Sequence, residues 1–418
     1  MLHELFPTTH LQYTSLPILG PVLQGYGTWL LTEGHSRACV RAHCQTARRL
    51  ARMLAQRGVG NLTELTRLQL RSCAPPRARE DSPLAALVHG LERYFECELS
   101  LYQPGPLSLV EQRIEVYATY LKQVRGLARA TITRHRSTAA AFLAHAGYDT
   151  SPQRVATLTA QDVEAFVRLA GQRLGRASLH NLVAEVRTLL RFLASAGEAP
   201  VGLDERIDTP RVYRHERLPR AWSWDTVQAF LRAIDRTSRP GLRDYPIFLL
   251  IATYGLRVSE VVGLTLDDID WRARRFRVRQ RKTGGVLWLP LTDEVGTAVL
   301  DYLQRGRPTP TKPYRQVFLR CRTPVRPLTR TVLNAALAVW ATRGGLSMPS
   351  HGVHGLRHSY AVHLLRLGTP IKTIGDVLGH RTIESTYVYL RLAIEDLRDV
   401  ALDLPAGVTD HAAAEVAP

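Results

Sequence analysis

The sequence predicts a mainly α-helical protein that contains one small antiparallel β-hairpin. Apolar residues recur at helical spacing through most of the chain, and glycine or proline ends many of these stretches. One pair of alternating segments, "RRFRVRQ" and "VLWLPL", flanks the tight tip "KTGG" and predicts the hairpin. With 418 residues, of which 45% are hydrophobic and 22% charged, the chain can bury the cores of two or three domains.

Residues 1–105 predict a helical N-terminal module. Helical periodicity runs from Arg37 to Arg57 and again from Leu84 to Glu96, and the breaker-rich segment "CAPPRARED" separates the two. The module can be a second DNA-binding domain or a surface for another protein, and the sequence leaves both open.

Residues 106–200 predict an all-α domain of four helices. They span 109–124, 129–146, 160–170 and 178–196, and Thr159 is a suitable N-cap for the third. The segment "YGTWLLTEGHSRACVRAHCQTARRLARML" of the N-terminal module is similar in order and helical phase to "YATYLKQVRGLARATITRHRSTAAAFLAH" of this domain. The similarity has two equally weighted explanations: duplication of a helical module, and the pattern that amphipathic helices share in general.

Residues 201–219 predict a linker, and residues 220–418 a third domain. We expect Ser223 or Asp225 to cap its first helix and residues 244–254 to form a buried helix. Further on, we expect Thr369 to cap a helix that begins at Pro370 and stops at Gly379. Thr382 then starts a helix that carries Tyr387 and Tyr389.

The net charge of +18 predicts a polyanionic partner, and nucleic acid is the usual one. A biased genomic base composition explains why arginine replaces lysine, but it does not explain 55 basic residues against 37 acids. The five cysteines form no zinc spacing, which favours reduced thiols. Without a signal peptide or a long apolar run, we expect a cytoplasmic protein, associated with the nucleoid, and no membrane partner.

Several basic and tyrosine side chains of the third domain form a set suited to breaking a phosphodiester. Arg257 lies one helical turn before Glu260, so the carboxylate can orient the guanidinium. His354 and Arg357 are three residues apart and share a helix face near an N-terminus, which favours a phosphate. Each pair by itself is more typical of an ordinary surface or core than of a catalytic site.

The remaining candidates are Lys282, His380 and Tyr389. Lys282 is part of the hairpin tip, where its ammonium can protonate a leaving oxygen. His380 follows Gly379 in a turn, and Tyr389 comes nine positions later. Tyr387 and Tyr389 are about 200° apart around a helix, so only one can face the phosphate. Guanidinium groups stay charged and clamp phosphate oxygens in a planar fashion.

The combination and order of these motifs resemble the tyrosine recombinase, or phage integrase, family. The resemblance rests on "TYGLRVSEVVGL", Lys282, "HGLRHSYAVHLL" and "VLGH" nine residues before a tyrosine, and it covers about residues 220–400. Residues 106–200 are similar to the core-binding, SAM-like domain of that family. The extra helical module over residues 1–105 departs from the minimal two-domain layout.

The resemblance implies a tyrosine recombinase catalytic fold and a role for each residue. Arg257 and Arg357 would clamp the scissile phosphate, His354 would act as a base or proton shuttle, and His380 would hydrogen-bond a phosphate oxygen. Lys282 would protonate the 5′ oxygen, Glu260 would support Arg257, and Tyr389 would attack to give a 3′-phosphotyrosyl bond. The family needs neither metal nor ATP nor any other cofactor.

By this resemblance the protein is a site-specific recombinase, integrase or transposase that acts on double-stranded DNA. Two to four copies would assemble on DNA, with companion recombinases as further partners, and the amphipathic segment "LRLAIEDLRDVALDLP" would dock on a neighbouring subunit or on its own domain. Two alternatives remain open at this point: a catalytically silent DNA-binding regulator, and a topoisomerase that relaxes DNA.

Overall fold

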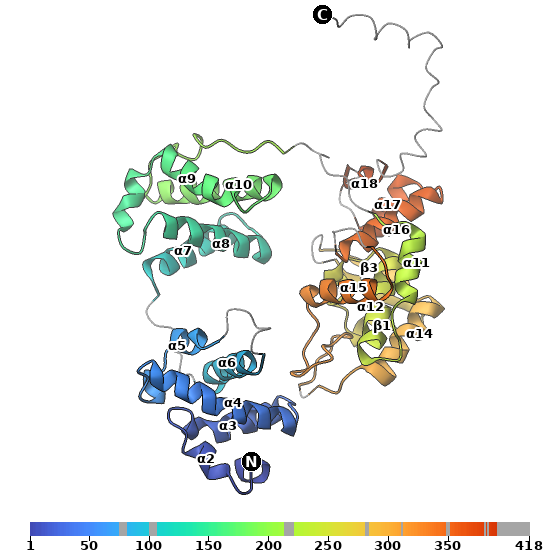
Figure 1. The fold of residues 1–418 in the computed structure, drawn as a ribbon. Coiled ribbons are helices and arrows are strands. Elements are labelled where there is room, and N and C mark those ends of the chain that lie inside the picture. Colours follow the sequence, from blue (N-terminus) through green and yellow to red (C-terminus); the bar gives the residue numbers. More distant parts are fainter. Residues whose placement is uncertain are drawn as a thin grey trace, which may run out of the picture. The chain divides into compact units, whose positions relative to one another are not determined.

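The computed structural model describes residues 1–74, 82–99, 107–212, 221–280, 284–310, 312–347, 352–379, 382 and 384–390. Two compact units result: one consists of residues 95–216, and the other combines residues 1–94 with residues 217–418. Each unit is mainly helical, and the described strands form a single small sheet, as Figure 1 shows. The predicted fold class is therefore confirmed. None of the helices in the described ranges combines the length and the apolar character that crossing a membrane requires.

Residues 1–94 form a helical module. Its elements are α1 (Leu2–Leu5), α2 (His10–Thr14), α3 (Gly20–Thr32), α4 (Arg37–Gln56), the 3-10 turn η1 (Leu62–Glu64), α5 (Arg67–Ser72) and α6 (Ser82–Tyr94). Helix α4 is the longest, and the side chains of Val40, Cys44, Ala47 and Leu50 on its inner face are fully buried. Ser36 caps α4 by accepting the N–H of Cys39.

Residues 95–216 form a separate bundle. A short π-helical turn, η2 (Phe95–Leu99), precedes α7 (Leu109–Gln123), α8 (Arg129–His145), the 3-10 turn η3 (Pro152–Thr157), α9 (Ala160–Gly171) and α10 (Arg176–Ser195). Ser108 and Thr159 begin capping boxes that start α7 and α9. The core consists of residues such as Tyr117, Phe142, Val163 and Leu189 from all four helices.

Residues 221–390 form the domain that carries the predicted site. Its helices are α11 (Trp224–Arg232), α12 (Arg239–Tyr254), α13 (Val258–Val261), α14 (Asp293–Asp301), α15 (Arg330–Arg343), α16 (His354–Arg366), α17 (Ile371–Leu378) and α18 (Glu384–Tyr387). The 3-10 turn η4 (Leu266–Asp268) and the π-helical turn η5 (Tyr302–Gly306) connect some of them. Ser223 caps α11, and α12 is buried on nearly all sides, as predicted.

The sheet of this domain has the strand order β1-β2-β3 and is antiparallel throughout. The strands are β1 (Ile269–Asp270), β2 (Arg275–Arg279) and β3 (Val286–Pro290), and Phe276 pairs with Leu289. Phe276 and Val278 point into the core, while the arginines between them point outward, which is the alternation that the sequence predicted.

Two details of the C-terminal helices differ from the prediction. Pro370, rather than Thr369, is the N-cap of α17, and its extended backbone (ψ 137°) starts the helix without a side-chain cap. Helix α18 ends at Tyr387, so it does not carry Tyr389. The amide of Tyr389 donates to the carbonyl of Thr386, three residues back, and this tighter bond turns the chain at that point.

Candidate active site

Arg257 is fixed at the junction between α12 and α13. Helix α12 ends at Tyr254, and its C-cap is Gly255, whose φ of 63° is left-handed. The missing side chain of Gly255 leaves room for Leu378 and Tyr360. Arg257 then becomes the N-cap of α13. The carboxylate of Glu260 accepts both the Arg257 amide (2.7 Å) and its Nη1 (2.8 Å). With only 2% of its side chain exposed, Glu260 locks the guanidinium in one orientation.

Arg357 lies in the first turn of α16 and is buried, with 3% of the residue exposed. Its guanidinium donates to the carbonyls of Gly255 (2.5 Å) and Leu378 (2.7 Å). Burial, and then repulsion from Arg257, lowers its pKa to about 10. The group therefore remains a cation at neutral pH. Because the two guanidinium groups repel each other, an anion bound between them would stabilise both.

Both arginines reach the same turn after α17. The Nη2 of Arg257 approaches the carbonyl of Gly379 (3.5 Å), one residue after the carbonyl that Arg357 contacts. Gly379 has a left-handed φ of 62°, and a Cβ there would lie 1.9 Å from the Nε2 of Gln280 at the end of β2. The structure thus gathers α12, α16, α17 and the end of β2 around one point.

Lys282 and His380 lie outside the described residues. Lys282 follows Gln280 by two positions, and His380 follows Gly379 directly. Gln280 and Gly379 are in contact with each other, and the carbonyl of Gly379 is the one that Arg257 approaches. The roles of Lys282 and His380 stay predictions.

His354, at the start of α16, is exposed and lines an open hollow of about 620 Å³. Arg257 and Ser259 line the same hollow from α13, and Thr331 and Asn334 line it from α15. The ring of His354 lies edge-on to the ring of His358, one turn later, with the ring centroids 4.7 Å apart. The hollow is therefore bordered by two of the predicted site residues.

Tyr389 is packed beside the arginines, with 2% of the residue exposed. It joins a small cluster with Ala361 and Val362 of α16 and Ile374 and Leu378 of α17. Burial raises the pKa of its phenol, while the charges of Arg357 and Arg257 lower it. Tyr387 is 44% exposed, so the structure brings only Tyr389 to the arginines.

His358 is a site residue that the sequence reasoning missed. Its Nδ1 lies 3.1 Å from the hydroxyl of Tyr389. The signal was present in "HGLRHSYAVHLL", because His358 lies four residues after His354 and thus one turn along the same helix. What the sequence could not show is that the chain after α17 returns Tyr389 to this histidine.

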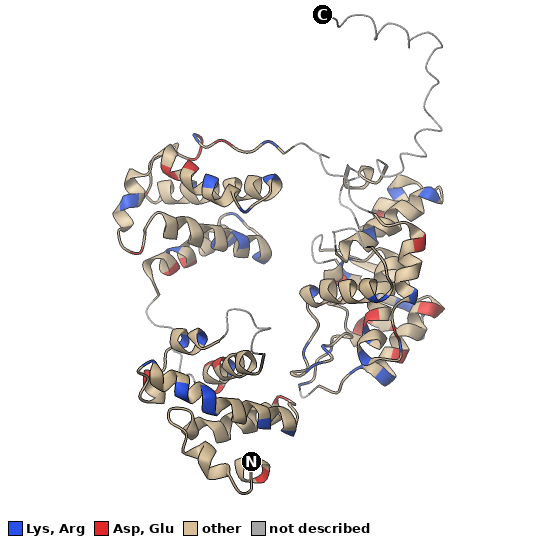
Figure 2. Cartoon of the chain, viewed as in Figure 1, with Lys and Arg blue, Asp and Glu red and all other residues tan. Residues whose placement is uncertain are grey.

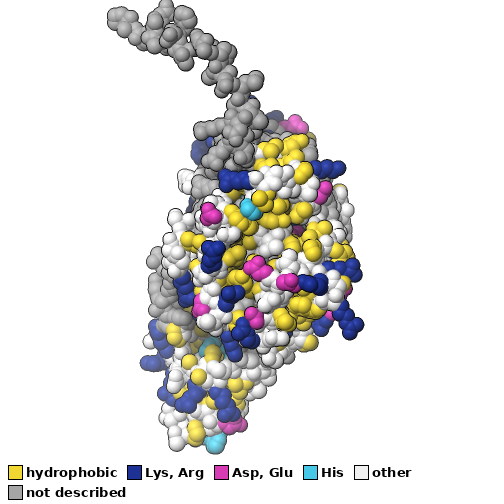
Figure 3. Space-filling model, turned by 90° about the vertical axis from the view of Figure 1, so that its right-hand side faces the viewer, with side chains coloured by type: hydrophobic (Ala, Val, Ile, Leu, Met, Phe, Trp, Pro, Cys, Tyr) yellow, Lys and Arg dark blue, Asp and Glu magenta, His cyan; other side chains and the backbone are white. Residues whose placement is uncertain are grey.

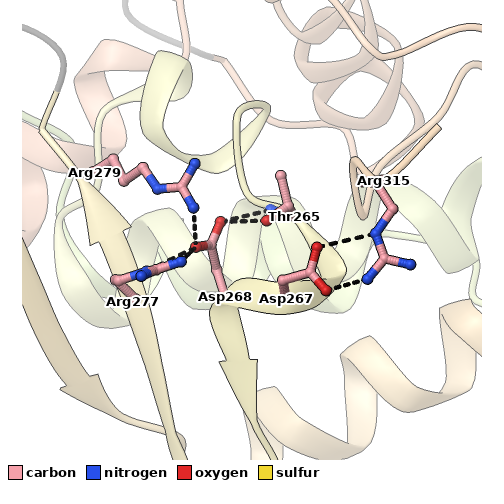
Figure 4. Close-up of polar contacts among 6 residues, drawn as sticks. All are labelled: Thr265, Asp267, Asp268, Arg277, Arg279 and Arg315. Atoms are coloured by element: carbon pink, nitrogen blue, oxygen red, sulfur yellow. Dashed lines mark hydrogen bonds and ion pairs between the residues drawn. The ribbon is translucent and has the colours of Figure 1, made fainter.

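A buried carboxylate fixes the strand that leads to the site. Asp268, 2% exposed, accepts hydrogen bonds from the amide and hydroxyl of Thr265 and from Arg277 and Arg279 of β2, as Figure 4 shows. Burial raises its pKa, but these hydrogen bonds outweigh burial and leave the pKa below its ordinary value. Asp267 pairs instead with Arg315. Asp268 therefore holds Arg277 and Arg279 of β2, whereas Arg275 pairs with Asp270.

The basic residues are spread over the chain. Figure 2 shows Lys and Arg on the helices of both units, and the face in Figure 3 has basic side chains scattered among hydrophobic and neutral ones. This distribution fits contacts to a long polyanion better than a single small anion.

The site combines two cations, a buried tyrosine and two histidines, which is a set suited to cleaving a phosphodiester. Comparison with known proteins identifies the family. Residues 223–395 match the phage integrase family, and residues 114–197 match its N-terminal SAM-like domain. The tyrosine recombinase XerD of Lacticaseibacillus casei is 30% identical over 280 residues, which cover 66% of this chain and 93% of that protein. The chain belongs to the phage integrase, or tyrosine recombinase, family, as predicted, and is an enzyme of that family.

Two further similarities extend over more of the chain. A Sinorhizobium fredii protein named "Putative integrase/recombinase y4rA" is 33% identical over 399 residues, which cover 94% of this chain and 96% of that protein. A crystal structure of a lambda integrase dimer bound to a COC′ core site has a TM-score of 0.53 at 15% identity, and covers 78% of this chain and 89% of that one. The second similarity concerns the fold alone.

Proposed function

We propose that this chain cuts and rejoins double-stranded DNA at specific sites through a covalent bond between DNA and Tyr389. The observation that carries the proposal is the position of the Tyr389 phenol, which is buried beside Arg357 and 3.1 Å from His358. Family membership supports the chemistry, and the names of the relatives describe integrases and recombinases.

The first step in the proposal is the binding of the scissile phosphate between Arg257 and Arg357. Each guanidinium is already oriented, by Glu260 in one case and by two carbonyl groups in the other. A preorganised cation needs no reorganisation as charge develops on the phosphate oxygens. Removal of one such donor typically slows a reaction by about 10²–10³.

Next, the Tyr389 oxygen attacks phosphorus, and the bond from phosphorus to the 5′ oxygen breaks. The phenol must lose its proton, and burial raises its pKa, so the reaction needs a base. His358 is within hydrogen-bond distance of the phenol, and His354 lies against His358. We assign the proton to His358, with His354 as the exposed relay.

The leaving 5′ oxygen takes a proton from Lys282, and His380 donates to a phosphate oxygen. These two roles rest on the family resemblance and on the contact between Gln280 and Gly379. Attack by a 5′ hydroxyl of a partner strand reverses the step and releases Tyr389. One phosphoester replaces another at each stage, so the sequence of steps needs neither metal nor ATP.

Assembly is the second part of the proposal. Two to four copies bind paired DNA sites, because exchange between two duplexes requires a nucleophile at each strand that is cut. Solved structures similar in fold to this chain include a recombinase, XerH, on its difH substrate and a lambda integrase dimer on a core site. The segment after Leu390, predicted to dock on a neighbour, lies outside the described residues. We also propose that companion recombinases bind the same paired DNA sites as further partners.

Neither alternative is favoured. A silent regulator does not need an oriented arginine pair beside a buried tyrosine. A relaxing topoisomerase is disfavoured because the relatives are named recombinases and integrases.

A nicked duplex that traps the cleaved state tests the proposal. The substrate is taken from the DNA that flanks the gene, with the protected site located first by footprinting. We expect a covalent protein–DNA adduct in the presence of EDTA, attached through the 3′ end of the cut strand. An adduct at the 5′ end, or none on a footprinted site, contradicts the proposed reaction.

A further inference from the structure

The N-terminal module repeats the architecture of the SAM-like bundle element by element. In each, a first helix (α3 or α7) leads to a long second helix (α4 or α8), then a 3-10 turn (η1 or η3), a third helix (α5 or α9) and a fourth (α6 or α10). The fourth helix packs on the second and on the third in both. This order extends the similarity seen in the sequence to the whole module.

A buried tyrosine–histidine pair recurs at the same place in both modules. The hydroxyl of Tyr26 on α3 lies 2.7 Å from the Nδ1 of His43 on α4. The hydroxyl of Tyr117 on α7 lies 3.1 Å from the Nδ1 of His135 on α8. In both pairs burial raises the pKa of the tyrosine and lowers that of the histidine, so both pairs are neutral at physiological pH.

The start of the second helix and the turn that follows it also agree between the two modules. Each second helix begins six residues before its histidine, at Arg37 or Arg129. Left-handed glycines follow both second helices, Gly58 in one module and Gly147 in the other. After each of these glycines the next amide donates back to a leucine carbonyl five residues earlier.

The third helices start alike. Thr66 and Thr159 each begin a capping box, and the leucine before each threonine is buried. Two unrelated helical bundles have no reason to share a buried hydrogen-bonded pair, a left-handed glycine turn and a capping box in the same order. Residues 1–94 are therefore a second copy of the SAM-like module.

The second helix of the N-terminal copy is strongly basic. Helix α4 contains five arginines and no acid, and α8 contains three arginines and no acid. Residues 1–94 have eleven arginines, no lysine and six acids. Figure 2 shows the basic residues along α4. The charge of this copy suits a polyanion.

Four of the arginines of α4 form a stripe, defined here as Arg37, Arg41, Arg48 and Arg52. At 3.6 residues per turn they lie within about 60° of arc and extend for about 22 Å along the helix. Arg41 and Arg48 stack over the rings of Phe6 and Tyr13, which holds their guanidinium groups in place. Within the stripe, Arg37 forms an ion pair with Glu4, and both side chains are more than half exposed.

We propose that the N-terminal copy binds duplex DNA through the arginine stripe of α4, in addition to the DNA held by the remainder of the chain. This inference rests on the proposed function only in that both involve duplex DNA. A stripe of about 22 Å spans several phosphates of one strand, since these repeat about every 3.4 Å along the axis. The chain would then bind a longer stretch of DNA than the catalytic and SAM-like domains need.

The test compares the full-length protein with the double variant Arg41→Ala/Arg52→Ala on a random-sequence 60-base-pair duplex. We expect the slope of log K against log salt to be less steep by up to about 1.8, because each lost phosphate contact removes about 0.9. The footprint on a long duplex should shorten at one end. Covalent adduct on a short nicked substrate should form as in the wild type, which separates this proposal from failure of the chemistry.

Glu4→Gln is the matched control, since it removes the acid that neutralises Arg37 and should change the slope in the opposite direction. Circular dichroism confirms that each variant is folded, and exposed positions such as Arg52 leave the core intact. An unchanged salt slope and footprint in the double variant overturn the proposal. The same holds if the variant changes only the sedimentation of the protein, because the stripe then contacts another subunit.

Discussion

Replacement of Glu260 by glutamine should disable Arg257 without changing the shape of the site. The carboxylate accepts two hydrogen bonds from Arg257, at 2.7 and 2.8 Å, and its side chain is 2% exposed. A glutamine has one acceptor oxygen, so its amide group would face one of these donors. A buried hydrogen bond to a charged group contributes about 1.5–3 kcal/mol, and leaving a buried donor unpaired adds about 1–3 kcal/mol. We therefore expect Glu260→Gln to lower the free energy of unfolding by about 2.5–6 kcal/mol, the sum of these two contributions.

The assay for this variant combines urea unfolding, followed by circular dichroism, with the rate of adduct formation on the nicked substrate. Loss of the orienting carboxylate should slow the adduct by about 10²-fold, as when one preorganised donor is removed. Glu294→Gln is the control, because Glu294 is exposed and should change stability by less than about 0.5 kcal/mol. If Glu260→Gln unfolds and reacts like the wild type, the argument that Glu260 orients Arg257 is wrong.

Three further variants test the surroundings of the arginine pair. Gly379→Ala should lower the free energy of unfolding by about 1–3 kcal/mol, because alanine is strained at a left-handed φ and its Cβ would meet Gln280. Gly202 is also left-handed but lies in open space, so Gly202→Ala should show the strain alone. Urea unfolding of the two variants separates the contributions. His358→Phe keeps an aromatic ring but removes the proton acceptor of Tyr389, so adduct formation should slow by about 10²–10⁴-fold. DNA binding, measured by fluorescence anisotropy, should be unchanged. If the variant and the wild type form adduct at equal rates, His358 takes no part in the reaction. Asp268→Asn should destabilise the protein most above about pH 4, because the folded pKa of Asp268 lies below its ordinary value of 3.8. The difference from the wild type should shrink as the pH falls through that lower folded pKa, and a difference that grows with acid would contradict the assigned ion pairs.

Much of the fold follows from local signals. In the SAM-like bundle, α7 and α9 begin with capping boxes, and left-handed glycines follow α8 and α10. The predicted ends of these helices agree with the observed ones to within two residues. The hairpin follows from alternation and from a glycine-containing tip. The start of α17 differs from the prediction. A threonine before a proline is suited to capping, but Pro370 itself takes the extended conformation of the N-cap.

The site depends on contacts that local patterns do not encode. Arg257 and Arg357 are a hundred residues apart in the sequence. Arg357 donates to the carbonyls of Gly255 and Leu378. Arg257 approaches the carbonyl of Gly379, which is the next residue. The sequence singled out both arginines by their motifs, but it could not show that Arg357 is buried or that His358 meets Tyr389. The repeated Tyr–His pair was equally hidden, since Tyr26 and His43 become partners only when α3 packs on α4.

Formation of the covalent adduct by Tyr389→Phe and Tyr387→Phe tests the central claim most directly. Both substitutions remove one hydroxyl, but Tyr389 is buried beside Arg357 whereas Tyr387 is 44% exposed. We predict that Tyr389→Phe binds the nicked DNA and forms no adduct, while Tyr387→Phe reacts like the wild type. Adduct from Tyr389→Phe together with none from Tyr387→Phe would contradict the account.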